Sequence, residues 1–218
     1  QLLRGYGKTM RYMALGIFPA MGGLAVIAHE LVSVLWGQDW IPVVLPFQIF
    51  CFCGAIRCIM TPTGAVFNTK HRPDLLFKFG LMQLSVTFIA VAGLGYTHGL
   101  NGVALGMLLA QFFSLLALKL MAGLVNSSFW TVLGFLKQPF WATGLMVVVL
   151  IVIKGVLLAA GLGSLAILMV IIPLGAAVYI LTVKIMFRDV FADVILTFRQ
   201  VVGDNAFYRI QRFRRHCT

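Results

Sequence analysis

The chain has 218 residues, of which 61% are hydrophobic and 11% charged, and its formal net charge is +11. Soluble domains carry about 25% charged residues, and a water-soluble core cannot hold this much apolar surface. The composition therefore excludes a soluble domain and predicts an integral membrane protein. The apolar runs are too long and continuous for a membrane β-barrel, so we expect an all-α fold.

Six stretches are long enough to cross a bilayer core, which needs roughly 20 helical residues. They are residues 11–36, 45–68, 76–96, 102–124, 138–160 and 165–187. Of the 17 lysines and arginines, fifteen lie on one side of this topology, Lys154 lies on the other and Arg57 falls inside a span. The positive-inside rule then places both ends of the chain in the cytoplasm. The basic charge thus indicates the orientation of the chain in the membrane and contact with lipid headgroups. We predict no nucleic-acid partner.

Residues 1–10 combine apolar with basic side chains. This pattern favours a short amphipathic segment on the cytoplasmic leaflet, and a linker from an upstream half of the protein is the alternative reading. The sequence begins with Gln1 and shows no cleavable signal pattern. We therefore expect a fragment that lacks its N-terminal part.

In the first span, small and polar residues recur every three or four positions and share one helix face: Gly16, Pro19, Gly23, Val26, Glu30, Ser33 and Gly37. Small residues let helices approach closely in lipid, and Pro19 is predicted to kink the helix. Glu30 lies on this face, so we expect its carboxylate to point inward. Two readings stay open: Glu30 coordinates a coupling cation or proton, or it is an interfacial carboxylate that pairs with a lysine or arginine in a part of the protein outside this sequence.

The second span carries an arginine near its predicted middle. Arg57 lies twelve residues after Leu45 and eleven before Asn68. A charged side chain at that depth costs about 2.5–3.5 kcal/mol on insertion scales, so something must compensate for it. Helical steps from Arg57 reach other small or polar residues, namely Gly54, Thr61, Gly64 and Asn68. We expect this stripe to face protein, water or an anionic ligand rather than lipid.

The third and fourth spans also carry polar or small stripes. Gln83 lies at helical spacing from Thr87 in the third span, and Gln111 lies in the fourth. The fourth span opens with the GxxxG pair Gly102 and Gly106, which predicts close packing against another helix. These four spans, over residues 11–136, are expected to form one packed group.

The last two spans, within residues 137–187, are almost uniformly apolar. Such helices suit the lipid-exposed periphery, so we expect them to support the site rather than form it. Residues 188–218 read as a basic amphipathic cytoplasmic tail that binds anionic lipids, with a partner-docking helix as the alternative. The cysteines Cys51, Cys53, Cys58 and Cys217 show no zinc-ligand spacing, and we expect no metal site and no cofactor.

Four stretches together match a known family: residues 18–40, the second span at 45–68, the loop HRPDLLFK at 71–78 and the helix pair around 96–107. They resemble the C-terminal half of bacterial polysaccharide exporters, the Wzx-like flippases of lipid-linked oligosaccharides in the MOP superfamily, which are related to MATE transporters. The family usually has a glycine where His71 stands, so the turn of that loop differs here. The last six of fourteen helices would then be present, and the apolar pair would lie beyond a twelve-helix MATE-like core.

The resemblance implies alternating access between two lobes that moves an undecaprenyl-diphosphate-linked sugar repeat across the bacterial inner membrane, driven by an ion gradient. It also implies a missing N-terminal transmembrane lobe and polysaccharide polymerase machinery as partners. In that setting Arg57 would contact the diphosphate or an acidic sugar, because guanidinium binds phosphate oxygens bidentately. Asn68, Gln83 and Gln111 would supply hydrogen bonds. A structural role for Arg57, capping carbonyls or pairing with an acid on the missing lobe, stays open.

Three other functions compete with this reading. A transporter of the same fold for drugs or small solutes would be told apart by a substrate-accumulation assay. A membrane enzyme acting on polyprenyl phosphate would need acidic clusters or a His–Asp constellation at one membrane face, and Glu30, Asp39 and Asp74 do not form one in the sequence. A structural scaffold is disfavoured by the striped polar spans. We expect a transporter and not an enzyme.

Overall fold

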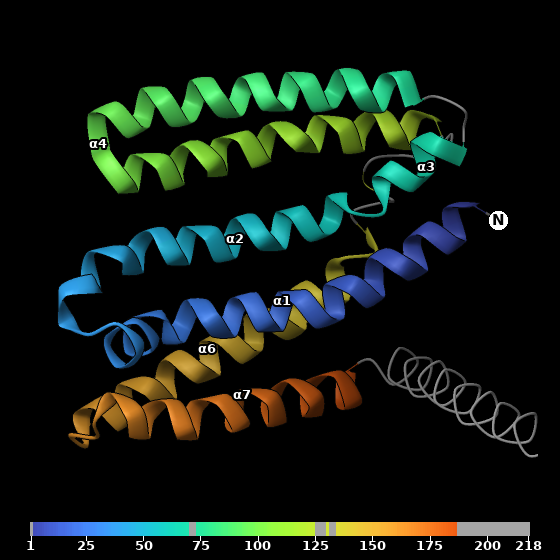
Figure 1. The fold of residues 1–218 in the computed structure, drawn as a ribbon. Helices are drawn as coiled ribbons and strands as arrows, with labels where there is room; N and C mark the ends of the chain where they lie inside the picture. Colours follow the sequence, from blue (N-terminus) through green and yellow to red (C-terminus); the bar gives the residue numbers. More distant parts are fainter. Residues whose placement is uncertain (1, 70–72, 125–129, 131–133, 187–218) are drawn as a thin grey trace, which may run out of the picture. The chain divides into compact units, whose positions relative to one another are not determined.

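The computed structural model describes residues 2–69, 73–124, 130 and 134–186, and these residues contain helices and no strands. The elements are α1 (Leu2–Leu35), the 3-10 helix η1 (Gln38–Val43), α2 (Val44–Met60), α3 (Thr63–Thr69), α4 (Pro73–Leu124), α6 (Lys137–Ala159) and α7 (Ser164–Met186) (Figure 1). The predicted all-α class is confirmed. The chain forms two compact units, Gln1–Tyr179 and Ile180–Thr218, and the second is described only over residues 180–186. The predicted tail at 188–218 lies outside the described residues.

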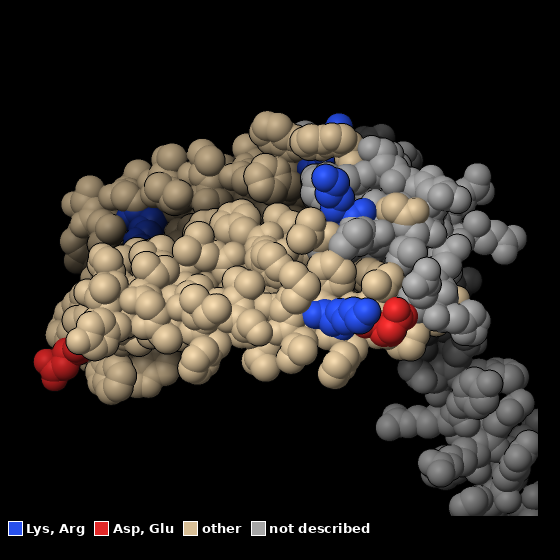
Figure 2. All heavy atoms as spheres, turned by 90° about the horizontal axis from the view of Figure 1, so that it is seen from above, with Lys and Arg blue, Asp and Glu red and all other residues tan. Residues whose placement is uncertain are grey.

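Five stretches of the described residues are long and apolar enough to cross a membrane: Gly5–Leu35, Gln38–Met60, Pro73–Leu116, Lys137–Ala159 and Ser164–Ile185. On the face seen in Figure 2, broad stretches of surface carry no Lys, Arg, Asp or Glu. An uncharged surface of this extent suits contact with hydrocarbon rather than water. The chain is therefore a multi-pass, all-α integral membrane protein, as its composition predicts.

Helix α4 reverses direction at Gly99. Its span of 44 residues is roughly 66 Å long at 1.5 Å per residue, about twice the thickness of a bilayer core. Gly99 has φ 57° and ψ −135°, outside the helical region, in a conformation that glycine adopts without strain. In Figure 1 the chain doubles back at this point, so α4 is a hairpin of two helices. The third and fourth predicted spans are its two halves, and six crossings of the membrane stay a prediction.

The two halves of the hairpin touch through the backbone, where the GxxxG motif predicts close packing. A Cβ added at Gly102 would overlap the carbonyl oxygen of Leu94. At Gly106 it would lie 2.7 Å from the carbonyl oxygen of Ala90. Because only hydrogen atoms fit at these positions, the halves come closer than larger residues allow. The predicted packing role of the motif is confirmed, and its partner is the preceding half of the same hairpin.

The helices of the first unit follow one another across a row: the α4 hairpin, α2, α1, α6 and the part of α7 up to Tyr179 (Figure 1). Small residues mark most of the contacts between neighbours. Ala104 of α4 packs with Ile49 and Cys53 of α2. Gly22 of α1 lies against Thr143 and Val147 of α6, and Gly175 of α7 lies against Leu150 of α6. Helix α1 therefore lies between α2 and α6.

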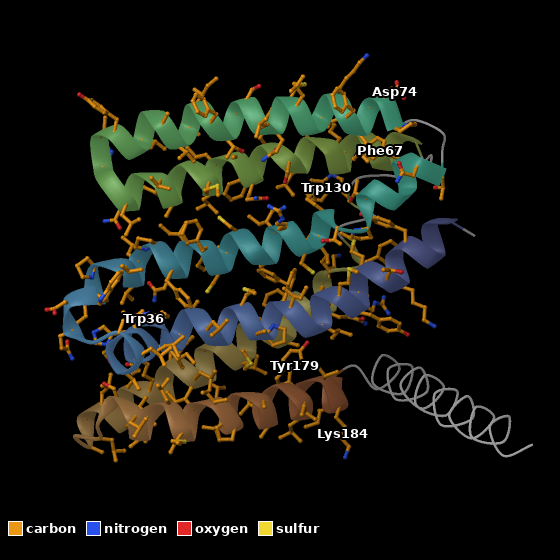
Figure 3. All side chains as sticks on the ribbon, viewed as in Figure 1. Trp36, Phe67, Asp74, Trp130, Tyr179 and Lys184 are labelled. Atoms are coloured by element: carbon orange, nitrogen blue, oxygen red, sulfur yellow. The ribbon has the colours of Figure 1, made fainter. Side chains whose placement is uncertain are left out.

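Helix α1 begins at Leu2 and runs for 34 residues, about 51 Å, so it is longer than a bilayer core of about 30 Å. Residues 2–10, expected as a separate segment, continue the first span as helix. Tyr6 and Met10 are buried in a cluster with Leu136 and with Phe67 of α3, which Figure 3 labels. The Tyr6 hydroxyl also lies 3.1 Å from the Thr63 hydroxyl. The first turns of α1 thus hold α3 in place.

The predicted second span is divided at Thr61 and Pro62. Pro62 has no N–H with which to continue the helix, and α2 ends at Met60. The Thr61 backbone N–H and hydroxyl both donate to the Arg57 carbonyl, at 3.2 and 3.1 Å. The prediction that Arg57 lies near the middle of one continuous helix is therefore wrong. It lies in the last turn of α2, where a cation interacts favourably with the helix dipole.

The hairpin contact can be tested with two alanine substitutions in α4. Gly106→Ala is expected to destabilise the full-length protein by about 1–3 kcal/mol, because the added Cβ meets backbone that must move. Gly93→Ala is the matched control, since a Cβ there meets nothing within 4 Å. It should be neutral or stabilise by up to about 1 kcal/mol, as alanine favours helix over glycine. Thermal unfolding in detergent measures both, and equal shifts for the two variants would contradict the hairpin packing.

Candidate functional site

Arg57 is exposed on α2, and Figure 1 shows that α2 runs in the same direction as the second half of α4. Ile49 and Cys53 of α2 pack against Ala104, with Leu108 beside them. One further turn along each helix brings Arg57 and Gln111 to the same level. Two of the predicted binding residues therefore lie at the same level of two adjacent helices.

The other two predicted binding residues are placed differently. The Gln83 side chain lies inside the α4 hairpin and donates from Nε2 to the Ala110 carbonyl oxygen, at 2.7 Å. Ala110 precedes Gln111, so Gln83 lies at the level of Gln111, but one of its amide hydrogens already serves to hold the hairpin together. Asn68 is exposed near the end of α3, beyond the break at Pro62. Arg57, Gln83 and Gln111 thus lie at one level of the fold, whereas Asn68 lies apart from them on α3.

A groove of about 870 Å³ opens between α1, α2 and α6. Its lining is almost wholly apolar and includes Phe52 and Ile59 of α2, while Gln48, Thr143 and Lys154 add polar atoms. Arg57 follows Gln48 by nine residues and Phe52 by five, which at about 100° per residue places it 140–180° around the helix from them. The apolar groove and the candidate Arg57 site therefore lie on opposite sides of α2.

Glu30 is 2% exposed, and its partner comes from α6. The Lys154 ammonium lies 2.8 Å from Oε2, off the direction of a hydrogen bond, so the contact is an ion pair. The same ammonium donates to the Val26 carbonyl oxygen at 2.7 Å, and the His29 Nδ1 atom lies 4.0 Å from Oε1. The pairing reading placed the cationic partner of Glu30 outside this sequence, and this location is wrong, because Lys154 on α6 of the same chain supplies the charge. The coupling role of Glu30 stays a prediction.

Burial explains why these two charges belong together. An isolated carboxylate or ammonium in a low-dielectric interior loses its hydration and is strongly disfavoured unless an opposite charge compensates it. The Glu30 side chain is 3% exposed and that of Lys154 is 19% exposed. The pair is neutral as a whole, so it joins α1 to α6 without leaving a net charge among apolar side chains.

The sequence itself indicates that Lys154 needs a partner inside the membrane, an indication that goes beyond its value for predicting topology. Lys154 is the single basic residue on its predicted side of the membrane and stands within an apolar span. An intramembrane lysine and an intramembrane glutamate each require a partner, which makes Lys154 a candidate for Glu30. Gln48 has no such signal. Its Nε2 donates to the Ala25 carbonyl oxygen of α1 at 2.9 Å, a contact between helices that spacing along one helix cannot show.

Metal ligation finds no support among the residues that the structure describes. No group of three or more His, Cys, Asp or Glu side chains lies close enough there to hold a metal ion. Cys51, Cys53 and Cys58 are buried free thiols, and Cys217 lies outside the described residues. Among the described residues, the groups considered for the site are therefore the Arg57 guanidinium, the nearby side-chain amides and the Glu30–Lys154 ion pair.

Helices of membrane-spanning length, joined by polar contacts between neighbours, define the class: a multi-pass membrane protein. The chain is 26% identical over 187 residues to the "Uncharacterized membrane protein in cps region" of Klebsiella pneumoniae, covering 85% of this chain and 38% of that protein. It is 30% identical over 107 residues to the lipopolysaccharide biosynthesis protein WzxC of Escherichia coli K12, covering 49% of this chain and 22% of that protein. It is 29% identical over 73 residues to the teichuronic acid biosynthesis protein TuaB of Bacillus subtilis 168, covering 34% and 15%.

These comparisons confirm the resemblance that the sequence motifs indicate: the chain is similar to Wzx-type polysaccharide biosynthesis proteins. The aligned parts span between 15% and 38% of the relatives' own lengths. No family model and no solved structure matches the chain.

The ion pair between α1 and α6 can be tested by removing one partner or both. Glu30→Gln and Lys154→Met are each expected to destabilise the full-length protein by about 3 kcal/mol, since each leaves the other charge uncompensated. The double variant, which leaves no charge, should recover a large part of that loss. Lys78→Met is the matched control, because Lys78 is exposed on α4. Thermal unfolding in detergent measures all four, and additive losses in the double variant would show that the two side chains act independently.

Proposed function

We propose that the chain is part of a flippase that moves undecaprenyl-diphosphate-linked oligosaccharide repeat units across the bacterial inner membrane by alternating access. The observation that carries the proposal is an exposed guanidinium in the last turn of a membrane-length helix, in a chain similar to proteins of lipopolysaccharide and teichuronic acid biosynthesis. The whole transporter includes a further N-terminal lobe that completes the cavity. Both ends of this chain lie in the cytoplasm.

Arg57 supplies the charge that an anionic lipid-linked substrate requires. A guanidinium remains protonated even where water is scarce, and its fork of N–H groups matches the oxygens of a phosphate. In this proposal the Arg57 side chain contacts the diphosphate or an acidic sugar. Its location favours this role, because Arg57 is exposed in the last turn of α2 and does not line the apolar groove.

Amide side chains near Arg57 would form hydrogen bonds with the sugar part of the substrate. Gln111 lies at the level of Arg57, and Gln83 retains its Oε1 acceptor after donating from Nε2 to Ala110. Amides donate and accept hydrogen bonds at once, which suits hydroxyl-rich ligands. Asn68, at the exposed end of α3, would act at a different point of the route from Arg57. Glu30 is the candidate for ion coupling, and a proton or cation that binds there competes with Lys154 for the carboxylate.

We propose transport rather than catalysis for the Arg57 site. A guanidinium cannot exchange a proton with substrate near neutral pH, and amides do not titrate, so these groups bind and orient rather than act as acid or base. A solute exporter of the same class is the alternative. It is distinguished by which compound depends on Arg57 for transport.

Substitution of Arg57 tests the proposed function. Arg57→Ala in the full-length protein is expected to reduce the flipping of lipid-linked oligosaccharide about tenfold or more, because a charge-assisted hydrogen bond contributes about 1.5–3 kcal/mol. Arg57→Lys keeps the charge but loses the bidentate fork, so it should fall between the wild type and Arg57→Ala. Lys78→Ala serves as the control for loss of an exposed positive charge. Full transport activity in both Arg57 variants would remove Arg57 from the mechanism.

A further inference from the structure

Proline inside α1 leaves a backbone carbonyl without its helical donor. Pro19 lies within the continuous helix Leu2–Leu35 and has no N–H, so the Leu15 carbonyl cannot form its usual bond to the residue four positions on. In a membrane no water is at hand to replace that bond. A proline at this depth is tolerated when a neighbouring helix offers a donor.

The donor comes from α7. The Tyr179 hydroxyl donates to the Leu15 carbonyl oxygen at 2.8 Å, a contact between residues 164 positions apart. Tyr179 is labelled on α7 in Figure 3. Tyr179 is half-buried, and its ring packs beside the apolar cluster that joins α1, α6 and α7. The α7 helix therefore satisfies the acceptor that Pro19 leaves free.

Pro19 also separates two packing clusters along α1. On one side, Tyr6, Met10, Ala14 and Phe18 pack with Phe67 of α3. On the other side, the α1 residues Val26 and Ile27 pack with α6 and α7, and Glu30 pairs with Lys154 of α6. Helix α2 packs against both halves of α1, through Ala55 and Ile59 on the first and through Gln48 on the second. The halves differ in their other neighbours, because α3 packs with the first half and the apolar cluster of α6 and α7 packs with the second. The backbone between them lacks one hydrogen bond of the helix.

We propose that Pro19 is a hinge in α1 and that Tyr179 is a positioning residue that holds this hinge in the observed conformation. When the Tyr179 hydroxyl donates to Leu15, the halves of α1 act as one helix. When that bond is released, the half that carries Tyr6 to Phe18 bends with α3 while the other half stays with α6. The inference concerns the mechanics of the helix row and does not depend on the substrate proposed for Arg57.

A double-mutant cycle separates this role from simple packing. Tyr179→Phe removes only the hydroxyl, and Pro19→Ala restores an N–H that can bond to Leu15 within the helix. In the full-length protein, Tyr179→Phe should lower the unfolding midpoint when Pro19 is present. In the Pro19→Ala background the same change should have little effect, because the carbonyl already has its donor. Tyr96→Phe is the matched control, since Tyr96 is 94% exposed on α4.

A distance measurement reports the hinge itself. Spin labels at Gly5→Cys and Leu35→Cys lie on the two sides of Pro19, about 45 Å apart in a straight helix at 1.5 Å per residue. They would be introduced after replacement of the four native cysteines. Tyr179→Phe should broaden the distance distribution and shift it to shorter values, and Pro19→Ala should narrow it again. If Pro19→Ala fails to fold, Pro19→Gly also restores the N–H and takes its place.

Two results would overturn the proposal. One is an equal loss of stability from Tyr179→Phe with and without the Pro19→Ala substitution, which would assign the hydroxyl to a contact unrelated to the proline. The other is an unchanged distance distribution in Tyr179→Phe. Because neither readout involves transport, the outcome for the hinge is independent of the Arg57 experiments.

Discussion

The helix row depends on polar side chains of neighbouring helices that donate to backbone carbonyls of α1 in an apolar environment. Three neighbours donate to this one helix: Gln48 of α2 to Ala25, Lys154 of α6 to Val26, and Tyr179 of α7 to Leu15. Each donor is a polar group on a helix that otherwise faces hydrocarbon or other apolar side chains. Since lipid provides neither donors nor acceptors, these contacts fix which helices can lie beside α1 and at what level. Apolar packing then fills the space between them.

The absence of hydrogen-bonding partners in lipid also bears on where charged side chains lie, and two different settings are found in this chain. The buried charges Glu30 and Lys154 compensate each other between α1 and α6, where the pair stabilises the row. Arg57 has a different setting, exposed in the last turn of α2 and turned away from the apolar groove. The Glu30–Lys154 pair contributes to the packing of the helices, whereas no such partner within α1, α2 or α6 is seen for the exposed Arg57 among the residues that the structure describes. This contrast is the basis for proposing a supporting role for the ion pair and a binding role for Arg57.

Fold class and several contacts were predictable because they depend on local composition. Apolar length predicts the membrane helices, and the spacing of Gly102 and Gly106 predicts close backbone packing, which the Leu94 and Ala90 contacts confirm. The predicted location of Arg57 was wrong, since hydropathy alone carried the second span through Thr61 and Pro62 to Asn68. Pro62 contained the correct signal, because proline ends an α-helix unless another group replaces its missing bond. The sequence allowed four binding residues to be proposed together, namely Arg57, Gln83, Gln111 and Asn68. It could not tell which of them lie close to one another in the fold.

Sequence by itself determined that this is an all-helical membrane protein, where its long apolar segments lie and which family it resembles, because these follow from the composition and order of residues along the chain. Only the tertiary structure decided that Glu30 pairs with Lys154, that Tyr179 serves the carbonyl freed by Pro19 and that Gln83 joins the two halves of α4. Each of these contacts links residues on different helices or on opposite arms of a hairpin. Helical periodicity predicts the face of the helix on which a polar side chain lies, but not which neighbouring helix supplies its hydrogen-bond or charge partner. In lipid, these partners determine how the helices pack.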